Sequence, residues 1–354
     1  MFDHKHYVPI LRWKQAEWLA LRHLDPAHCA QITPLVEVTP RSVAPRTRRP
    51  TVEQMLQKNA ADMRENWHRA PLFVDLWHLE GLPECGGVHP FLYLSREARA
   101  QNVSLIPVTG LSRPHSYQSA VASIVGIDLR GACVRLFIQD VTRPNLGEHL
   151  DELLSRLDLE RGQVDLLVDC QYIDGSCPDW SPLVARIPHL RDWRTFVLAS
   201  GAFPPDLTGF RVGQHLLARM DWQAWRRLLA AGAGLERKPA YGDYTIQHAL
   251  YREAPARANF SASIRYTAHS HWVIMRGEGV FHDVSPGFPQ WPANAQLLCS
   301  RPEFCGDDFS YGDTYIYQMS QQTDQTGSAE TWLRAGINHH LTFVVSQIAN
   351  PFGT

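Results

Sequence analysis

The chain has 354 residues, of which 44% are hydrophobic and 20% are charged, and its formal net charge is -2. This length allows one large domain with additions, and the composition is typical of a folded protein rather than a disordered one. The near-neutral charge excludes a general nucleic-acid coat and an electrostatic membrane binder, so nucleic acid would have to bind at a local site.

The seven cysteines are scattered along the chain, and none of them forms a CxxC pair. Cys170 with Cys177, or Cys299 with Cys305, could be metal-ligand pairs, but incidental thiols in a reducing cytoplasm explain the pattern better. The first 14 residues lack the apolar segment of a signal peptide, and no run approaches the roughly 18 apolar residues that span a bilayer. We therefore expect a cytoplasmic protein without membrane association.

The first two thirds of the chain alternate between apolar runs and segments with helical spacing. The clearest run, VDLLVDCQYI at residues 164–173, contains Asp169 toward its C-terminal end. Such runs are typical of strands buried on both faces of a parallel sheet, and the alternation indicates βαβ units. The predicted strands span residues 7–13, 32–38, 71–75, 103–109, 132–139, 164–173 and 195–200. The predicted helices between them span residues 14–24, 51–67, 90–101, 116–125, 146–157, 180–190 and 222–231.

The alternation ends near residue 236. Residues 241–244 are the best candidate for an eighth strand, and residues 261–276 contain two β-runs that predict a hairpin. Residues 284–308 are rich in Pro, Gly and Cys and are expected to be irregular, whereas 314–322 favour no element. Residues 329–348 predict a final helix.

These elements predict a (β/α)8 TIM-like barrel with a C-terminal β-hairpin insertion before the last helix. We expect a single domain over residues 1–354, in which 236–328 form an irregular and β-rich insertion that decorates the barrel mouth. The alternative is an open doubly wound sheet. A dinucleotide site in such a sheet is disfavoured, because the turn after the first strand is Arg12-Trp13-Lys14 and lacks glycine.

In a barrel of this kind the functional groups lie at the C-terminal ends of the strands. The polar residues placed there are Arg12, Lys14, Glu37, Asp75, Thr109, Asp140, Asp169 and Ser200. Carboxylates in this position can hold a divalent cation, the one cofactor that they suggest, or serve as acid and base. Structural ion pairing explains them equally well, and the sequence does not show which side chains point inward.

Several further groups are candidates for chemistry. Arg135 lies within an apolar strand and needs an acidic partner, because an unpaired buried charge is very costly. Arg265 and Arg276 lie on neighbouring strands of the predicted hairpin and could clamp a phosphate or a carboxylate, unless they are surface charges. The arginine-rich loop at residues 41–50 is either a solvated linker or an anion-facing loop.

Two adjacent histidines, His339 and His340, lie on the predicted last helix. Adjacent helical residues point about 100° apart, so both histidines cannot comfortably chelate one ion. A buried, hydrogen-bonded role is expected for them, or else one of them faces the barrel mouth as an acid–base group. The sequence contains no P-loop, no nucleophile elbow and no zinc-type spacing, so no metal ligand is assigned.

Several stretches, in order along the chain, resemble the beta protein family, which is named after a satellite-phage product. They are YVPILRWK at 7–14, ITPLVEV at 32–38, VRL at 134–136, the strand with Asp169, SIRYT at 263–267, Arg276-Gly277, and Trp332 with GINHH at 336–340. The resemblance implies a prophage-borne protein that acts beside a killing partner encoded by a neighbouring gene. It implies no reaction and assigns no residue a role.

Three hypotheses follow. The first is a component of a phage-defence or toxin–antitoxin-like module that binds a partner protein or a phage product at the barrel mouth. The second is a metal-dependent phosphodiesterase or nuclease-like hydrolase, and the third is a barrel that serves only as a scaffold. The candidate catalytic residues are Lys14, Glu37, Asp75, Arg135, Asp169 and His340, and the candidate ligand- or phosphate-binding residues are Arg12, Arg265, Arg276 and His339.

Overall fold

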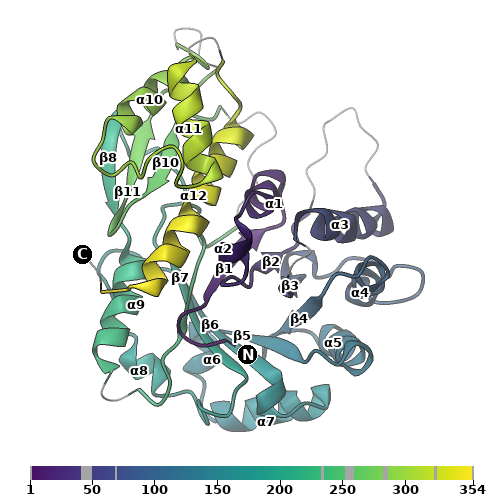
Figure 1. Cartoon of the computed structure of the whole chain (residues 1–354). Helices are drawn as coiled ribbons and strands as arrows, with labels where there is room; N and C mark the ends of the chain where they lie inside the picture. Colours follow the sequence, from purple (N-terminus) through teal and green to yellow (C-terminus); the bar gives the residue numbers. More distant parts are fainter. Residues whose placement is uncertain are drawn as a thin grey trace.

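The computed structural model describes residues 2–40, 50–67, 70–232, 235–251, 259–281, 286–322 and 325–352. Its centre is a closed barrel of parallel strands (Figure 1). The strands, in their order around the barrel, are β1 (Tyr7–Arg12), β2 (Leu35–Glu37), β3 (Leu72–Asp75), β4 (Leu105–Thr109), β5 (Ala132–Phe137), β6 (Val164–Tyr172), β7 (Thr195–Gly201) and β9 (Ala240–Asp243). The predicted barrel, including the eighth strand, is confirmed.

Helices cover the outside of this barrel, as the alternation of the sequence requires (Figure 1). They are α1 (Gln15–Arg22), α2 (Pro26–Cys29), α3 (Val52–Asn66), α4 (Pro90–Ala100), α5 (His115–Asp128), α6 (Ile138–Val141), α7 (Leu146–Leu157), α8 (Ser181–Val184) and α9 (Met220–Ala230). Local sequence starts some of them directly: Thr51 and Gln54 form a capping box at the start of α3. The predicted arginine-rich loop lies mostly outside the described residues.

Alternation along the strands decides which side chains enter the barrel. Val8 and Ile10 of β1 and Leu167 of β6 belong to the apolar cluster of the barrel interior. Because strand side chains alternate between the two faces, Arg12 and Asp169 point inward two residues further on. The barrel is therefore apolar through its centre and charged at its C-terminal mouth.

A small lobe lies beside the barrel and contains β8 (Gly213–Ala218), β10 (Ile264–Thr267), β11 (His271–Arg276), α10 (Gln290–Cys299) and α11 (Tyr311–Gln321) (Figure 1). The predicted hairpin is confirmed as β10 and β11, and β8 completes an antiparallel sheet in the order β10-β11-β8. The lobe has its own apolar core around Tyr266, Trp291 and Ile316.

Two parts of the lobe differ from the prediction. Residues 284–308 were expected to be irregular but contain α10, whose Trp291, Ala295 and Leu298 are buried at helical spacing. The strand β8 was not predicted. It is largely exposed, so its sequence lacks the long apolar run that marks the buried barrel strands.

The last helix, α12 (Ala329–Ala349), runs from the small lobe along the barrel and contacts α1, α11 and β10 (Figure 1). Close approach requires small residues here: a Cβ atom on Gly312 of α11 would lie 2.1 Å from the carbonyl oxygen of Ala335 on α12. The lobe and the barrel are thus locked together through one helix. Among the described residues, no helix has the length and apolar character needed to cross a membrane.

Candidate functional site

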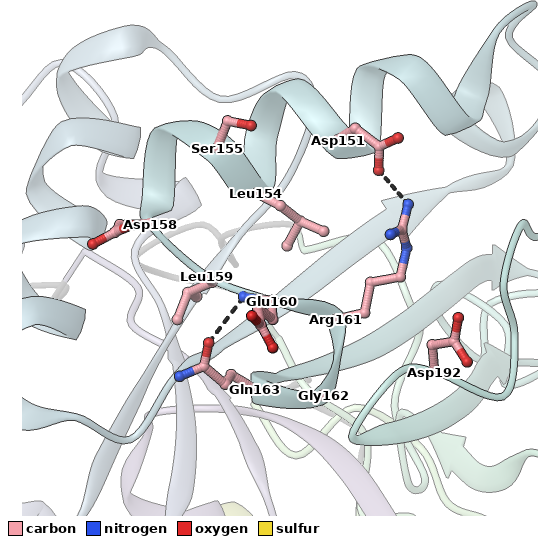
Figure 2. Close-up of a pocket in the computed structure, with 10 residues that line it drawn as sticks. All are labelled: Asp151, Leu154, Ser155, Asp158, Leu159, Glu160, Arg161, Gly162, Gln163 and Asp192. Atoms are coloured by element: carbon pink, nitrogen blue, oxygen red, sulfur yellow. Dashed lines mark hydrogen bonds and ion pairs between the residues drawn. The ribbon is translucent and has the colours of Figure 1, made fainter.

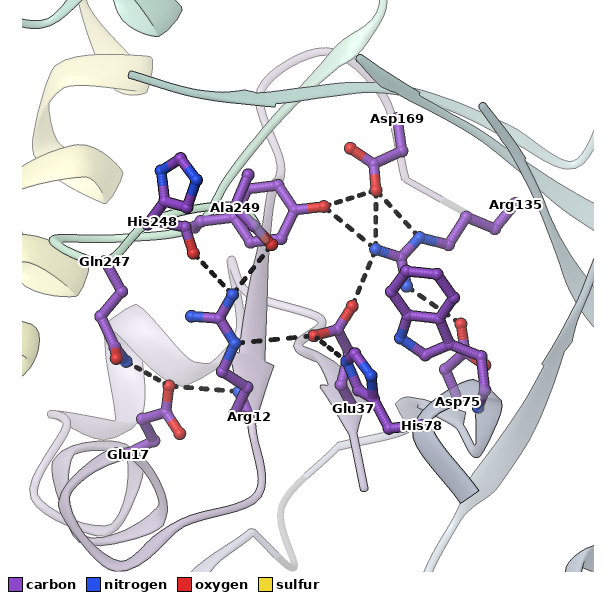
Figure 3. Close-up of polar contacts among 12 residues, drawn as sticks. Arg12, Glu17, Glu37, Asp75, His78, Arg135, Asp169, Gln247, His248 and Ala249 are labelled. Atoms are coloured by element: carbon purple, nitrogen blue, oxygen red, sulfur yellow. Dashed lines mark hydrogen bonds and ion pairs between the residues drawn. The ribbon is translucent and has the colours of Figure 1, made fainter. Parts of the chain in front are cut away.

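One arginine gathers three carboxylates at the barrel mouth (Figure 3). The guanidinium group of Arg135 on β5 donates to Glu37 at 2.9 Å, to Asp75 at 3.0 Å and to Asp169 at 2.6 and 3.0 Å. Tyr244, which follows β9, lies 3.0 Å from Arg135 and donates to Asp169 at 2.5 Å. We call these five residues the mouth cluster. All of them are buried, so the acid partner that Arg135 requires comes from three different strands.

Two more arginines balance the charge of this cluster. Arg113 binds both carboxylate oxygens of Asp75, at 3.1 and 2.9 Å, and Arg12 lies 3.9 Å from Glu37. Three guanidinium groups thus face three carboxylates. The desolvation cost of burying each charge is offset by its neighbours of opposite charge, so all six are needed together. Arg12 also donates to the carbonyl oxygens of residues 248 and 249 (Figure 3).

The electrostatics of the cluster favour the ionised forms. Burial alone would raise the pKa of Glu37, but the charge of Arg135, the hydrogen bond to His78 and the charge of Arg12 lower it to about 2. Burial disfavours the charged form of Arg135 as well, yet Tyr244 and the surrounding carboxylates raise its pKa well above the usual value. Glu37 and Arg135 are therefore both charged near neutral pH and form a permanent ion pair.

A carboxyl group with a raised pKa lies next to the cluster. Glu17 of α1 is buried and accepts hydrogen bonds from the backbone N–H of Arg12 and from the Gln247 side chain (Figure 3). Burial raises the pKa of Glu17 to about 7, although the charge of Arg12 opposes this shift. Its second oxygen, Oε2, has no hydrogen-bond partner among the described residues.

The outer edge of the mouth is cationic and aromatic. Nζ of the exposed Lys14 lies 4.6 Å from the ring centre of Tyr251, whose ring is 5.0 Å from that of His78. The rings of His78 and Trp77 are 4.5 Å apart. Trp77, His78 and Tyr251 are half-buried. We call these four residues the mouth rim. They present flat side chains and one charge above the buried cluster.

The chain segment 244–249 connects the mouth to a second feature. Its residues contact the mouth cluster, Glu17 and Arg12, while the carbonyl oxygen of Ile246 accepts a hydrogen bond of 2.9 Å from Arg265 on β10. Arg265 and Arg276 line a groove of about 610 Å³ between this segment, residues 205–208, the small sheet and α12. These two predicted ligand-binding arginines therefore lie together, but apart from the mouth cluster.

The histidine pair lies elsewhere. His340 is 2.9 Å from Asp243 and 2.7 Å from Thr267, and His339 is 2.8 Å from Asp313. Both rings are fully buried between α12, β9 and the small lobe, on the outer side of the barrel wall. Both histidines are buried and hydrogen-bonded, which is the first of the two roles expected for them, and neither faces the barrel mouth. Their contacts tie the last helix to both halves of the molecule.

Other strand-end residues serve the loops. Asp140 caps the turn at Phe137, forms an ion pair of 3.2 Å with Arg143 and accepts a hydrogen bond from Ser112. A cavity of about 210 Å³ beside Asp140 is lined by Trp77, Arg113 and Arg135 among others. Within the described part of the chain, no group of three or more His, Cys, Asp or Glu side chains is arranged to hold a metal ion.

Another cavity, of about 840 Å³, lies at the opposite end of the barrel (Figure 2). Its lining includes Glu160 and Arg161 just before β6 and Asp192 just before β7, and an ion pair joins Arg161 to Asp151 of α7. In barrels of this architecture the N-terminal end contributes to stability rather than to the functional site. The mouth is therefore the better candidate for the functional site than this cavity.

Four residues at the mouth were missed by the sequence reasoning: Glu17, His78, Arg113 and Tyr244. Two of them could have been found from their position in the sequence relative to the predicted strands. His78 and Arg113 lie in the loops that follow β3 and β4, where functional groups of such barrels are found. Glu17 gave no comparable signal, because its burial arises only when the chain folds.

Comparison with known families gives one match. The model of the family described as Beta protein matches residues 7–346, nearly the whole chain. The match includes the barrel, the small lobe and most of α12. No curated protein matches the chain.

Proposed function

The chain belongs to the Beta protein family, and from this premise we propose that it is a component of a prophage-encoded phage-defence or toxin–antitoxin-like module that binds a partner protein at the mouth rim. The partner is the product of a neighbouring gene, as the resemblance to the satellite-phage protein implies. The chain would restrain the killing effect of this partner by holding it in a complex.

The single observation that carries this proposal is the layering of the mouth. The rim exposes Lys14 beside aromatic rings, and aromatic side chains are enriched at the centres of protein interfaces. Directly below, the ion pairs of the mouth cluster hold the loops that carry these rings: Arg135 lies 5.3 Å from the ring centre of Trp77. A rigid platform with a half-exposed aromatic surface is suited to binding.

The alternative, a metal-dependent hydrolase, gains little support from the same geometry. Each carboxylate of the mouth cluster is already bound to Arg135, within 2.6–3.0 Å. Bringing a divalent cation among them would place it against a guanidinium group in a buried site, which is electrostatically unfavourable.

Co-expression tests the proposal. The neighbouring gene's product is expressed alone and together with the chain, and both growth and co-purification are measured. Protection and complex formation are expected with the wild-type chain. Lys14→Glu and Tyr251→Ala should weaken both, because they change the charge and the ring at the centre of the rim.

A matched control comes from the other end of β1. Lys5 is exposed and precedes β1 at the other end of the barrel, so Lys5→Glu makes the same charge change away from the mouth and should protect as the wild type does. The proposal is wrong if the two proteins do not associate, or if both rim variants fold, bind and protect as well as Lys5→Glu.

A further inference from the structure

The groove between the barrel and the small lobe carries excess positive charge. Its described lining contains two arginines, Arg265 and Arg276, and one acid, Asp206. Arg265 is half-buried, and within the described residues no carboxylate pairs with it: its one hydrogen bond goes from Nη1 to the carbonyl oxygen of Ile246. This arrangement contrasts with that of Arg135, which is surrounded by acids.

The two guanidinium groups point to the same side of the small sheet. Arg265 of β10 is paired with Ile274 of β11, and Arg276 lies two residues beyond Ile274. Residues two apart on a strand share a face, so both arginines project from the face opposite the lobe core. Burial and, to a smaller extent, the nearby charge of Arg276 together lower the pKa of Arg265 to about 10.

Backbone contacts hold both side chains in place. Arg276 donates from Nε to the carbonyl oxygen of Leu207 at 3.2 Å, and the guanidinium group of Arg265 lies 4.7 Å from the ring centre of Phe203. Neutral carbonyl oxygens orient an arginine without cancelling its charge, and the charge of Asp206 acts only on Arg276 and offsets one of the two positive charges. The remaining N–H groups of two oriented guanidinium groups are then available to an anion, for which their planar geometry is well suited.

The rest of the lining completes a site for a phosphorylated molecule. The hydroxyls of Ser261 and Ser263 lie 2.9 Å apart at the arginine side of the groove, where Ser263 also accepts a hydrogen bond from the backbone of Gly277. Phe260 and Leu333 supply apolar surface elsewhere in the lining. A volume of about 610 Å³ is within the usual range for small-molecule sites. It exceeds the need of a bare phosphate ion.

We propose that this groove binds a phosphate monoester of nucleotide size, with the phosphoryl group held between Arg265 and Arg276 and the organic part against Phe260 and Leu333. Two guanidinium forks match the three oxygens of a phosphate monoester better than the two oxygens of a carboxylate. The site is separate from the mouth rim and does not depend on partner binding there.

Calorimetry with the purified full chain tests the proposal, using the four common ribonucleoside monophosphates, inorganic phosphate and succinate as probes. At least one nucleotide should bind saturably, more tightly than inorganic phosphate and much more tightly than succinate. Arg265→Gln and Arg276→Gln should each weaken its binding about tenfold or more, and binding should weaken as salt is added.

Two further variants keep the test decisive. Arg186→Gln is the matched control, because Arg186 is also held by backbone carbonyl oxygens but lies just after α8, outside the lining of the groove, and it should bind as the wild type does. Ser261→Asp places a carboxylate in the wall of the groove, where it should abolish nucleotide binding without lowering thermal stability. The proposal is overturned if no nucleotide binds saturably, if succinate binds as tightly, or if the arginine variants that remain folded bind as Arg186→Gln does.

Discussion

Arg135 and Asp169 are joined twice, because Nε and Nη2 of the arginine both donate to the same carboxylate oxygen, at 3.0 and 2.6 Å. The two residues lie on the adjacent parallel strands β5 and β6, where Phe137 is the registered neighbour of Asp169. The offset of two residues lets the long arginine side chain reach across the mouth toward β2 and β3. This one side chain therefore connects four strands of the barrel.

Replacing Arg135 should strongly destabilise the fold. Arg135→Met keeps much of the apolar volume but leaves Glu37, Asp75 and Asp169 buried without their shared counter-charge. Breaking a buried ion pair from one side costs about 3–5 kcal/mol. Chemical denaturation should therefore show a loss of about that size in the free energy of unfolding.

An exposed ion pair provides the comparison. Arg22 is paired with Glu65 at 2.7 Å, and the two side chains are 48% and 59% exposed. Arg22→Met should change the free energy of unfolding by less than about 1 kcal/mol, because solvent screens such pairs. If Arg135→Met is no more destabilising than Arg22→Met, the mouth cluster does not hold the barrel together.

Glu17 should make stability depend on pH near neutrality. Folding raises the pKa of this carboxyl group from 4.5 to about 7, so the folded chain holds a proton that the unfolded chain releases. The resulting stabilisation is fully present below pH 4.5 and is lost as the pH rises through 7. Glu17→Gln keeps the shape of the protonated side chain at every pH.

The wild type should therefore lose stability relative to Glu17→Gln as the pH rises from 5 to 8, by on the order of 3 kcal/mol. Urea denaturation at several pH values measures this difference. Parallel stability curves for the two proteins would contradict the prediction. Glu152→Gln, on an exposed side chain of α7, serves as the control.

The crossing of α11 and α12 depends on Gly312. Its absent side chain lets the two helices approach, since a Cβ atom would lie 2.1 Å from the Ala335 carbonyl oxygen. Gly312→Ala should lower the free energy of unfolding by about 1–3 kcal/mol through overpacking. The exposed Gly126 in α5 has no atom within 4 Å of such a Cβ, so Gly126→Ala should raise the free energy by up to about 1 kcal/mol. The same sign for both variants would refute the role of Gly312.

Divalent cations should not stabilise the chain through the mouth cluster. Its three carboxylates already accept hydrogen bonds from Arg135, and a cation would have to displace that guanidinium group. Thermal unfolding is expected to be unchanged by millimolar magnesium or manganese. A rise in the melting temperature that Asp169→Asn removes would instead support the metal-dependent hydrolase.

The sequence alone determined the alternation of strands and helices, because burial on both faces leaves long apolar runs and helix faces leave spaced ones. It also indicated the strand ends as the place of Glu37, Asp75 and Asp169, and it showed that Arg135 needed an acidic partner. These properties are local, because each of them depends on residues that are close together in the sequence.

Only the tertiary structure decided which of these side chains meet. The inward direction of Glu37 and Asp169 depends on strand register, and a shift of one residue would have turned them outward. His340 was an equally good candidate from the sequence, yet the path of α12 places it behind the barrel wall. The proton affinity of Glu17 and the unneutralised charge of Arg265 arise from segments far apart in the chain, so packing had to bring those segments together before either property existed.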